Sequence, residues 1–251
     1  MEPEFQTALR IASYNIRAGL GTDLRRDPAR TLRAIAALKA DIVTLQEADF
    51  RMGARPSALP RDLLRDMTGL VPVAGDDRSL GWHGIALLVR PDIVAQDVHR
   101  LDLPSAEPRG AVVVDLLSAL GPIRVVGVHL GLLRRSRRRQ LDYVRDFIGG
   151  LAPMPTVIAG DFNERSTRVG LGRIAQDFTI LPAARTFPST LPLLPLDRIA
   201  HCDQLQVRME PVPKMPAPHP SDHRPIVAAV TARPMAGSRR PDPPHSSPLP
   251  R

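Results

Sequence analysis

The sequence predicts an α/β sandwich built on mixed β-sheets. Short runs rich in β-branched residues alternate with stretches of helical periodicity, which is typical of α/β proteins. Some of these runs follow a helix, whereas others follow one another directly as hairpins. A purely parallel sheet needs a crossover between its strands, so this mixture favours mixed sheets. The 251 residues, of which 43% are hydrophobic, suffice for a proper core in one large domain or two small ones.

Eight runs have the length and composition of strands, and three stretches have helical periodicity. The predicted strands are Leu9–Ile16, Asp41–Gln46, Gly84–Val89, Ala111–Leu117, Ile123–Leu130, Thr156–Ala159, Arg198–Cys202 and Ile226–Thr231. The predicted helices are Ala29–Leu38, Arg61–Met67 and Ser136–Leu151. In the third helix, Leu141, Val144, Ile148 and Leu151 form one apolar stripe.

The ordered domain is expected to span residues 8–232. Residues 233–251 contain six prolines and almost no side chains to bury, so we expect a disordered Pro/Arg-rich tail. No apolar run approaches the roughly 20 residues of a membrane span, and the acidic N-terminus has no signal-peptide pattern. A single cysteine, Cys202, excludes an internal disulfide. We expect a cytoplasmic monomer.

The net charge of +8 comes almost entirely from arginine, because Lys39 and Lys214 are the only lysines. Arginine binds phosphate through two parallel hydrogen bonds, so a phosphate-bearing substrate or surface is one interpretation. A GC-rich genome, which favours arginine over lysine, explains the same bias equally well.

The most informative segment is Val157–Asn163, an apolar β-branched run that ends in Gly160-Asp161-Phe162-Asn163. Residues at i and i+2 of an extended or tightly turned backbone point to the same side, so Asp161 and Asn163 can converge. A carboxylate beside an amide suits activation of water and stabilisation of a developing oxyanion. Alone, the segment is a weak signal, because Gly-Asp-x-Asn more often forms an ordinary turn.

Other predicted strands also end or begin at polar residues, and catalytic sets are commonly assembled in this way. These residues are Asn15, Glu47, His129, Asp197, Asp222 and His223. The oxygen ligands Glu47, Asp222 and Asn15 suit a hard cation such as Mg²⁺ or Mn²⁺. The two histidines can hold and protonate a phosphoryl oxygen, with Asp197 orienting one imidazole and Arg109 clamping the phosphate.

In its ordered set of motifs, the chain resembles the endonuclease/exonuclease/phosphatase superfamily. The motifs are Ser13-Tyr14-Asn15, Leu45-Gln46-Glu47, Glu107-Pro108-Arg109-Gly110, Gly127-Val128-His129-Leu130, Gly160-Asp161-Phe162-Asn163, Asp197-Arg198-Ile199 and Ser221-Asp222-His223. Each motif is ordinary alone, but seven in the order of the family are specific. The resemblance spans about residues 9–230 and implies a DNase I-like fold, a four-layer α-β-β-α sandwich with two packed mixed sheets.

The resemblance also implies roles for these residues. Glu47 looks like the principal ligand of a Mg²⁺ or Mn²⁺ ion, with Asn15 and Asp222 around it. Asp161 looks like the residue that positions or deprotonates the attacking water, and Asn163 like a donor to a phosphoryl oxygen. His223 resembles the catalytic histidine of the family and Asp197 its orienting partner, while His129 resembles the second histidine of the DNase I-like and sphingomyelinase-like branches. The implied reaction is in-line attack of water on a phosphorus ester.

Two positions depart from the family pattern. Related chains often have His-Gly-Asn-Ala where this chain has His83-Gly84-Ile85-Ala86, so one expected polar contact is absent. Some nuclease branches have an acid where this chain has Arg17, which argues against the abasic-endonuclease branch. His83 is assigned to the substrate side, although a packed aromatic corner with Trp82 is an equal alternative.

The substrate class stays open at the level of sequence. Positive charge favours nucleic acid, whereas an aromatic content of 4% provides few stacking platforms for bases. The five arginines within Arg134–Arg139 more often indicate a solvated helix entry. Because they follow His129 directly, they are also consistent with a phospholipid or inositol headgroup, or with a peripheral contact with an anionic membrane or nucleic acid. A soluble phosphoester is the third option. A non-catalytic phosphate-binding protein is disfavoured because Glu47, Asp161 and His223 are all present, and a serine hydrolase is rejected because no Gly-x-Ser-x-Gly elbow exists.

Overall fold

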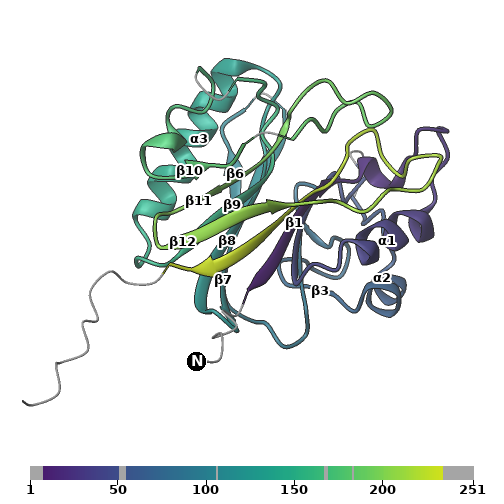
Figure 1. Cartoon of the computed structure of the whole chain (residues 1–251), viewed down its shortest axis with the longest axis horizontal. Coiled ribbons are helices and arrows are strands. Elements are labelled where there is room, and N and C mark those ends of the chain that lie inside the picture. Colours follow the sequence, from purple (N-terminus) through teal and green to yellow (C-terminus); the bar gives the residue numbers. More distant parts are fainter. Residues whose placement is uncertain (1–7, 51–54, 106, 167–168, 183, 234–251) are drawn as a thin grey trace, which may run out of the picture.

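The structure is a computed structural model that describes residues 8–50, 55–105, 107–166, 169–182 and 184–233. Two β-sheets pack face to face, and helices lie on the outer face of each sheet (Figure 1). The prediction of a four-layer α-β-β-α sandwich with mixed sheets is therefore confirmed. The expected tail lies outside the described residues except for Arg233, and the boundary of the domain stays a prediction.

The first sheet has seven strands in the order β12-β13-β1-β2-β5-β3, with β4 beside β5. Its strands are β1 (Leu9–Asn15), β2 (Ile42–Gln46), β3 (Val71–Pro72), β4 (Gly81–Trp82), β5 (Ile85–Val89), β12 (Leu205–Glu210) and β13 (Ile226–Ala232). The β1–β2 pair is parallel, whereas β13 and β5 run antiparallel to β1 and β2 respectively.

The second sheet has six strands in the order β10-β11-β9-β8-β7-β6. Its strands are β6 (Val94–Leu103), β7 (Arg109–Ser118), β8 (Gly121–His129), β9 (Thr156–Asp161), β10 (Thr179–Ile180) and β11 (Asp197–His201). The β8–β9 pair is parallel, while β7 runs antiparallel to β8 and β11 antiparallel to β9.

Three apolar layers hold the sandwich together, and each follows from side chains that alternate along the strands. Between the sheets, Ile11 and Ile85 of the first sheet share a buried core with Val112, Val125 and Val157 of the second. The outer face of the first sheet packs on α1 (Pro28–Ala37) and α2 (Arg61–Thr68). The outer face of the second sheet packs on α3 (Arg134–Gly149) (Figure 1). Short 3₁₀ turns lie at Arg17–Gly19 and Ile174–Gln176.

All eight predicted strands and all three predicted helices are present, with ends shifted by no more than two residues. The largest omission from the sequence prediction is β6, the edge strand of the second sheet. Most of its side chains are exposed, so its sequence alternates polar and apolar residues only at its end, around Leu101 and Leu103. The strand β12 was also missed, because it too is an edge strand with few fully buried side chains.

Candidate active site

The topology brings the predicted site residues to one end of the sandwich. The parallel strands β1 and β2 end at Asn15 and Gln46, and the parallel strands β8 and β9 end at His129 and Asp161. The antiparallel neighbours β5, β7, β11 and β13 begin at that same end. Their first residues, or the loops just before them, carry His83, Arg109, Asp197, Asp222 and His223.

One carboxylate oxygen, Oδ2 of the buried Asp161, is the point where side chains from several elements meet. The Asn15 amide nitrogen Nδ2 donates a hydrogen bond to it over 3.1 Å. His129 Nε2 lies 3.5 Å from it and His223 Nε2 lies 3.8 Å from it. The other oxygen, Oδ1, accepts the backbone N–H of Asn163 at 2.9 Å. The structure therefore brings Asn15, His129 and His223 together around Asp161.

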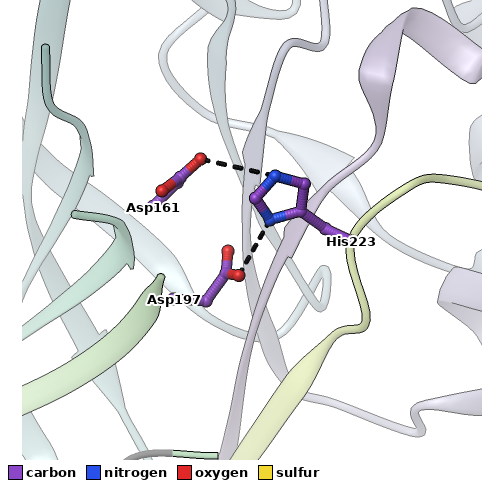
Figure 2. Close-up of side chains that lie close together, drawn as sticks. All are labelled: Asp161, Asp197 and His223. Atoms are coloured by element: carbon purple, nitrogen blue, oxygen red, sulfur yellow. Dashed lines mark hydrogen bonds and ion pairs between the residues drawn. The ribbon is translucent and has the colours of Figure 1, made fainter. Parts of the chain in front are cut away.

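His223 lies between two aspartates, as Figure 2 shows. Its Nδ1 is 2.9 Å from Asp197 Oδ2, and its Nε2 faces Asp161. Asp161 and Asp197 are paired residues of β9 and β11, so the sheet register fixes the position of both carboxyl groups. The Phe187 ring, 5.0 Å away between centroids, packs against the imidazole. Asp197 thus contacts one ring nitrogen of His223 while the other, Nε2, faces Asp161, and the predicted orienting role of Asp197 stays a prediction.

Burial and neighbouring charges shift the two central groups in ways that suit acid–base chemistry. Burial, reinforced by the charge of Asp197, raises the pKa of Asp161 to about 7. Burial lowers the pKa of His223, but the charge and hydrogen bond of Asp197, together with Asp161 and Asp222, outweigh it and raise that pKa to about 9. Near neutral pH, Asp161 can therefore take up a proton, while His223 carries one.

Glu47 and Asn15 form the oxygen-rich corner of the site. The Asn15 amide nitrogen is 3.5 Å from Glu47 Oε1, and Glu47 follows directly on β2 with a positive φ of 53°. The Glu47 side chain lines the two hollows at this end of the molecule. The Asn15 amide oxygen accepts the Arg17 backbone N–H at 3.1 Å, so the Glu47 carboxylate is the oxygen ligand that fits a hard divalent cation best here, with the Asn15 side chain next to it.

Asp222, the third predicted metal ligand, forms an ion pair with Arg17, whose Nε lies 3.3 Å from Asp222 Oδ2. Arg17 stands at the position where some related nucleases have an acid, and here it partly satisfies the Asp222 carboxylate. Among the described residues, the metal-ligating groups of Asp161, Asp197 and His223 lie within 4.8 Å of one another. Because Asp197 already binds His223 Nδ1, we interpret this cluster as an acid–histidine pair facing Asp161 rather than as an ion site.

His129 and Arg109 form the basic side of the site. Arg109 Nη1 is 2.7 Å from His129 Nε2 and 2.9 Å from His129 Nδ1, and Arg109 Nη2 donates to Glu107 Oε2 at 3.1 Å. These three residues line a hollow of about 200 Å³ that reaches Glu47 and His83. Arg109 therefore lies at the site, where a phosphate group could replace a part of its present contacts.

His83 lines the same hollow and also packs against Trp82. Both alternatives left open by the sequence, a residue on the substrate side and a packed aromatic corner, therefore fit its position. Its ring packs edge-on against Trp82, with 4.9 Å between centroids. Its Nδ1 is 2.6 Å from Arg55 Nη1, and its Nε2 is 2.7 Å from Asp102 Oδ1. His83 is thus part of a packed aromatic corner that also lines the hollow.

Asn163 is placed differently from the other predicted residues. Its backbone N–H binds Asp161, but its side-chain Nδ2 donates to the Leu130 carbonyl at 2.9 Å. Its side chain lines a separate hollow beside α3. The predicted role of Asn163 as a phosphoryl-oxygen donor stays a prediction.

Sequence reasoning missed several residues of the site. Arg55 and Asp102 hold His83, and Arg26 lines a second hollow of about 490 Å³ with Arg17, Glu47 and His223. Asp102 lies in β6, which the sequence did not predict, so it was missed together with that strand. No local sequence pattern distinguishes Arg55 or Arg26. Glu107 could have been found, since it stands two residues before Arg109 within the same motif.

Comparison with known proteins shows the family of the chain. The model of the Endonuclease/Exonuclease/phosphatase family matches residues 12–223. The uncharacterized protein YbhP of Escherichia coli K12 is 30% identical over 249 residues, covering 90% of this chain and 97% of YbhP. Along the described residues, no helix is long and apolar enough to cross a membrane.

Two solved structures share the fold at low sequence identity. The mannosyl-6-phosphatase Bt3783 of Bacteroides thetaiotaomicron is 19% identical, with a TM-score of 0.66 over 89% of this chain and 99% of that one. D. rerio TDP2, complexed with a single-strand DNA product, is 18% identical, with a TM-score of 0.65 over 90% of this chain and 100% of that one. From the family match over most of its length, this chain belongs to the endonuclease/exonuclease/phosphatase family and is a hydrolase acting on phosphoric ester bonds.

Proposed function

We propose that the chain is a Mg²⁺- or Mn²⁺-dependent phosphodiesterase in which Asp161 activates a water for in-line attack on phosphorus and His223 assists. The observation that carries this proposal is the convergence of Asn15, His129 and His223 on one oxygen of Asp161. Activation of water needs a base near the pH of the cell, and the raised pKa of Asp161, about 7, meets that requirement.

His223 supplies the complementary charge. With its pKa raised to about 9, its imidazolium can donate from Nε2 to an oxygen of the phosphoryl group. Asp197 keeps the other ring nitrogen occupied at 2.9 Å, so the ring cannot rotate away. On the opposite side, Arg109 and His129 offer further donors to the remaining oxygens.

Glu47 and Asn15 would hold the divalent cation. Asp222 would become a further ligand when its ion pair with Arg17 opens. A bound Mg²⁺ or Mn²⁺ would neutralise charge on the phosphoryl oxygens. The position of Glu47 between the hollow with Arg109 and the hollow with Arg17 supports this assignment.

The arrangement of the two hollows favours a diester. One hollow carries Arg55, His83 and Arg109, and the other carries Arg17 and Arg26, so space and arginine side chains that can bind phosphate lie on both sides of Glu47, with the carboxylate of Asp49 lining both hollows. A phosphorus bound at Glu47 could then keep a substituent on each side. The two structural relatives span this choice, since one is named a sugar phosphatase and the other is complexed with DNA.

Hydrolysis of a phospholipid or inositol-phosphate headgroup is the second candidate. It is favoured by the exposed arginines of α3 next to the exposed leucines Leu132 and Leu133. A non-catalytic phosphate-binding protein on the same fold is a more remote alternative, against which the complete set of Glu47, Asp161 and His223 weighs. Cytoplasmic location and a monomeric state remain part of the proposal.

A panel of substrates tests the proposed activity. Purified protein with Mg²⁺ or Mn²⁺ is offered bis-p-nitrophenyl phosphate, p-nitrophenyl phosphate, plasmid DNA, single-stranded RNA and anionic phospholipid in parallel. We expect hydrolysis of at least one diester that is abolished by EDTA and by His223→Ala. The matched control is His99→Ala, which removes a half-buried histidine that packs on Phe147 beside α3.

Activity that survives both EDTA and His223→Ala would overturn the mechanism. The bond that breaks can be identified independently by carrying out the reaction in ¹⁸O-labelled water. Attack on phosphorus puts the label in the phosphate product, whereas label in the released alcohol would show that a carbon–oxygen bond is cleaved.

A further inference from the structure

The helix α3 begins in a way that neither helix capping nor the helix dipole explains. Its N-cap is Leu133, which makes no side-chain capping hydrogen bond, and its first turn contains no acidic residue. Arginines occupy that turn instead, although positive charge is unfavourable at a helix N-terminus. Departures of this kind from local preference are expected where a surface has a function.

Exposed aliphatic side chains stand beside these arginines. Leu132 is 65% exposed, Leu133 is 68% exposed and Val169, across a shared hollow, is 57% exposed. On the described surface, these are among the most exposed large hydrophobic side chains. Three such side chains around one hollow form a patch rather than isolated exceptions.

The backbone under the leucines is held firmly, so their exposure is built into the fold. The Gly131 N–H donates to Gln140 Oε1 at 2.8 Å, and the Leu132 N–H donates to Glu107 Oε1 at 3.3 Å. The buried Arg137 donates to the Gly131 carbonyl and is fixed in turn by Glu164 at 2.7 Å. These contacts fix the backbone that carries the exposed Leu132 and Leu133 side chains.

Positive charge surrounds this apolar tip. The side chains of Arg134, Arg135, Arg138 and Arg139 are exposed and line a hollow of about 420 Å³ on α3. The acid in that hollow, Asp142, is paired with Arg173 at 2.6 Å, so it does not cancel the arginines. Arg165, also exposed, borders the neighbouring hollow.

We propose that this surface, defined by Leu132, Leu133, Val169 and the exposed arginines 134, 135, 138 and 139, docks the protein on an anionic phospholipid membrane. Aliphatic side chains gain by entering the acyl boundary, while arginines around them bind lipid phosphates. A nucleic acid would use the arginines but has no comparable use for exposed leucines, and on α3 only Tyr143, about one turn beyond Arg139, offers an exposed ring for stacking on a base.

The docking surface is continuous with the candidate active site. His129 ends β8 only three residues before Leu132, and Asn163, which binds Asp161 through its backbone, lines the same hollow as the two leucines. A protein docked here would therefore hold its catalytic end close to the lipid phosphates. The proposal concerns binding and does not depend on the proposed chemistry of Asp161.

Vesicle co-sedimentation of the full chain tests the proposal, using phosphatidylcholine alone and phosphatidylcholine mixed with phosphatidylglycerol. We expect binding to the mixed vesicles that falls at least tenfold in Leu132→Ser/Leu133→Ser. The matched control is Leu191→Ser/Leu193→Ser, which changes leucines that are 64% and 53% exposed outside this surface. Because residues 233–251 also contain arginines, this comparison between variants, not binding alone, decides the question.

A second pair of variants tests the charge. Arg138→Gln/Arg139→Gln should weaken binding to the mixed vesicles severalfold, whereas Arg33→Gln/Arg65→Gln, on the exposed faces of α1 and α2, should not. Hydrolysis of a soluble phosphoester should be the same in all four variants, which separates failure of docking from failure of the catalytic proposal. Equal vesicle binding by the two leucine pairs, or arginine-dependent binding to DNA without binding to vesicles, would overturn the proposal.

Discussion

At the scale of single residues, the environment of each side chain determines which role the residue can take at the site. Asp161 and His223 face each other at 3.8 Å. Burial raises the pKa of Asp161 to about 7, whereas Asp197 raises the pKa of His223 to about 9 against the effect of burial, so near neutral pH Asp161 can accept a proton while His223 carries one. Glu47, His83 and Asn163 hold positive φ angles of 53°, 49° and 50°. Such backbone conformations are uncommon outside glycine, and they cluster here where side chains must be aimed.

The first prediction concerns Asp197, which acts through His223. Asp197→Asn should lower kcat by a factor on the order of 10³, because His223 loses both its orientation and the charge that keeps it protonated. KM should change little, since Asp197 is fully buried and cannot touch substrate. Steady-state kinetics on the preferred phosphoester checks this split. A rise in KM at unchanged kcat would show that Asp197 acts on binding instead.

The second prediction concerns the metal corner. Glu47→Gln should raise the Mg²⁺ concentration for half-maximal activity by about 10-fold or more, because a neutral amide is a weaker ligand than a carboxylate. Asp222→Asn should raise it less, since Arg17 already neutralises part of that carboxylate at 3.3 Å. Activity titrated with Mg²⁺ and isothermal titration of the metal-free protein both measure the effect. The opposite order of the two variants would make Asp222 the principal ligand.

At the scale of elements, the N-termini of α1 and α3 differ in whether a side chain caps the helix. The helix α1 begins with Asp27, whose Oδ1 accepts the Arg30 N–H at 2.9 Å, followed by Pro28 at the first helical position. The helix α3 begins without a capping side chain at Leu133. One helix follows the local rules of capping and the other departs from them at the proposed docking surface.

This contrast leads to a third prediction. Leu133→Ser should stabilise the protein by about 1 kcal/mol, because serine can cap the free N–H groups of α3. Asp27→Ala should destabilise it by about 1 kcal/mol by removing the cap of α1. Urea denaturation of the two variants measures both changes. A loss of stability in Leu133→Ser would mean that the exposed leucine contributes to the fold itself.

The fourth prediction concerns the ion pair that ties residues 21–26 to α1. The hydrogen bond from Arg30, at 2.9 Å, lowers the pKa of Asp23 to about 2 in the folded protein. The unfolded value is about 4, so this pair stabilises the fold fully above pH 4 and loses its effect as the pH falls toward 2. In Asp23→Asn, the free energy of unfolding should fall less steeply between these pH values. Identical pH dependence in the variant and the wild type would show that solvent screens the pair.

At the scale of the whole molecule, the order of motifs along the chain is sufficient to predict the layers, and most of the residues predicted for the site lie together at one end of the sandwich. Each site motif stands at a strand end, and antiparallel and parallel pairing then brings these ends together. What the sequence could not predict depends on contacts between distant segments. The Arg17–Asp222 pair joins residues far apart in the chain, and Arg55 reaches His83 from a loop without a pattern.

The pairing of the two sheets also explains why the exposed strands escaped prediction while the buried ones did not. Strands such as β5 and β9 are buried along their whole length and contain apolar runs, Ile85–Val89 and residues 157–159, because both of their faces lie inside the sandwich. Edge strands such as β6 face solvent and carry charged residues that protect the edge. The sequence pattern therefore predicts the buried strands of the sandwich better than its edge strands.

The central claim, that Asp161 is the base at the centre of the site, is tested most directly by the activity of Asp161→Asn. The variant and the control Asp203→Asn, an exposed aspartate in the turn before β12, are assayed on the same phosphoester at saturating Mg²⁺. We expect kcat/KM to fall by at least about 100-fold in Asp161→Asn and to remain unchanged in the control. A folded Asp161→Asn protein that keeps activity close to that of the wild type would contradict the account.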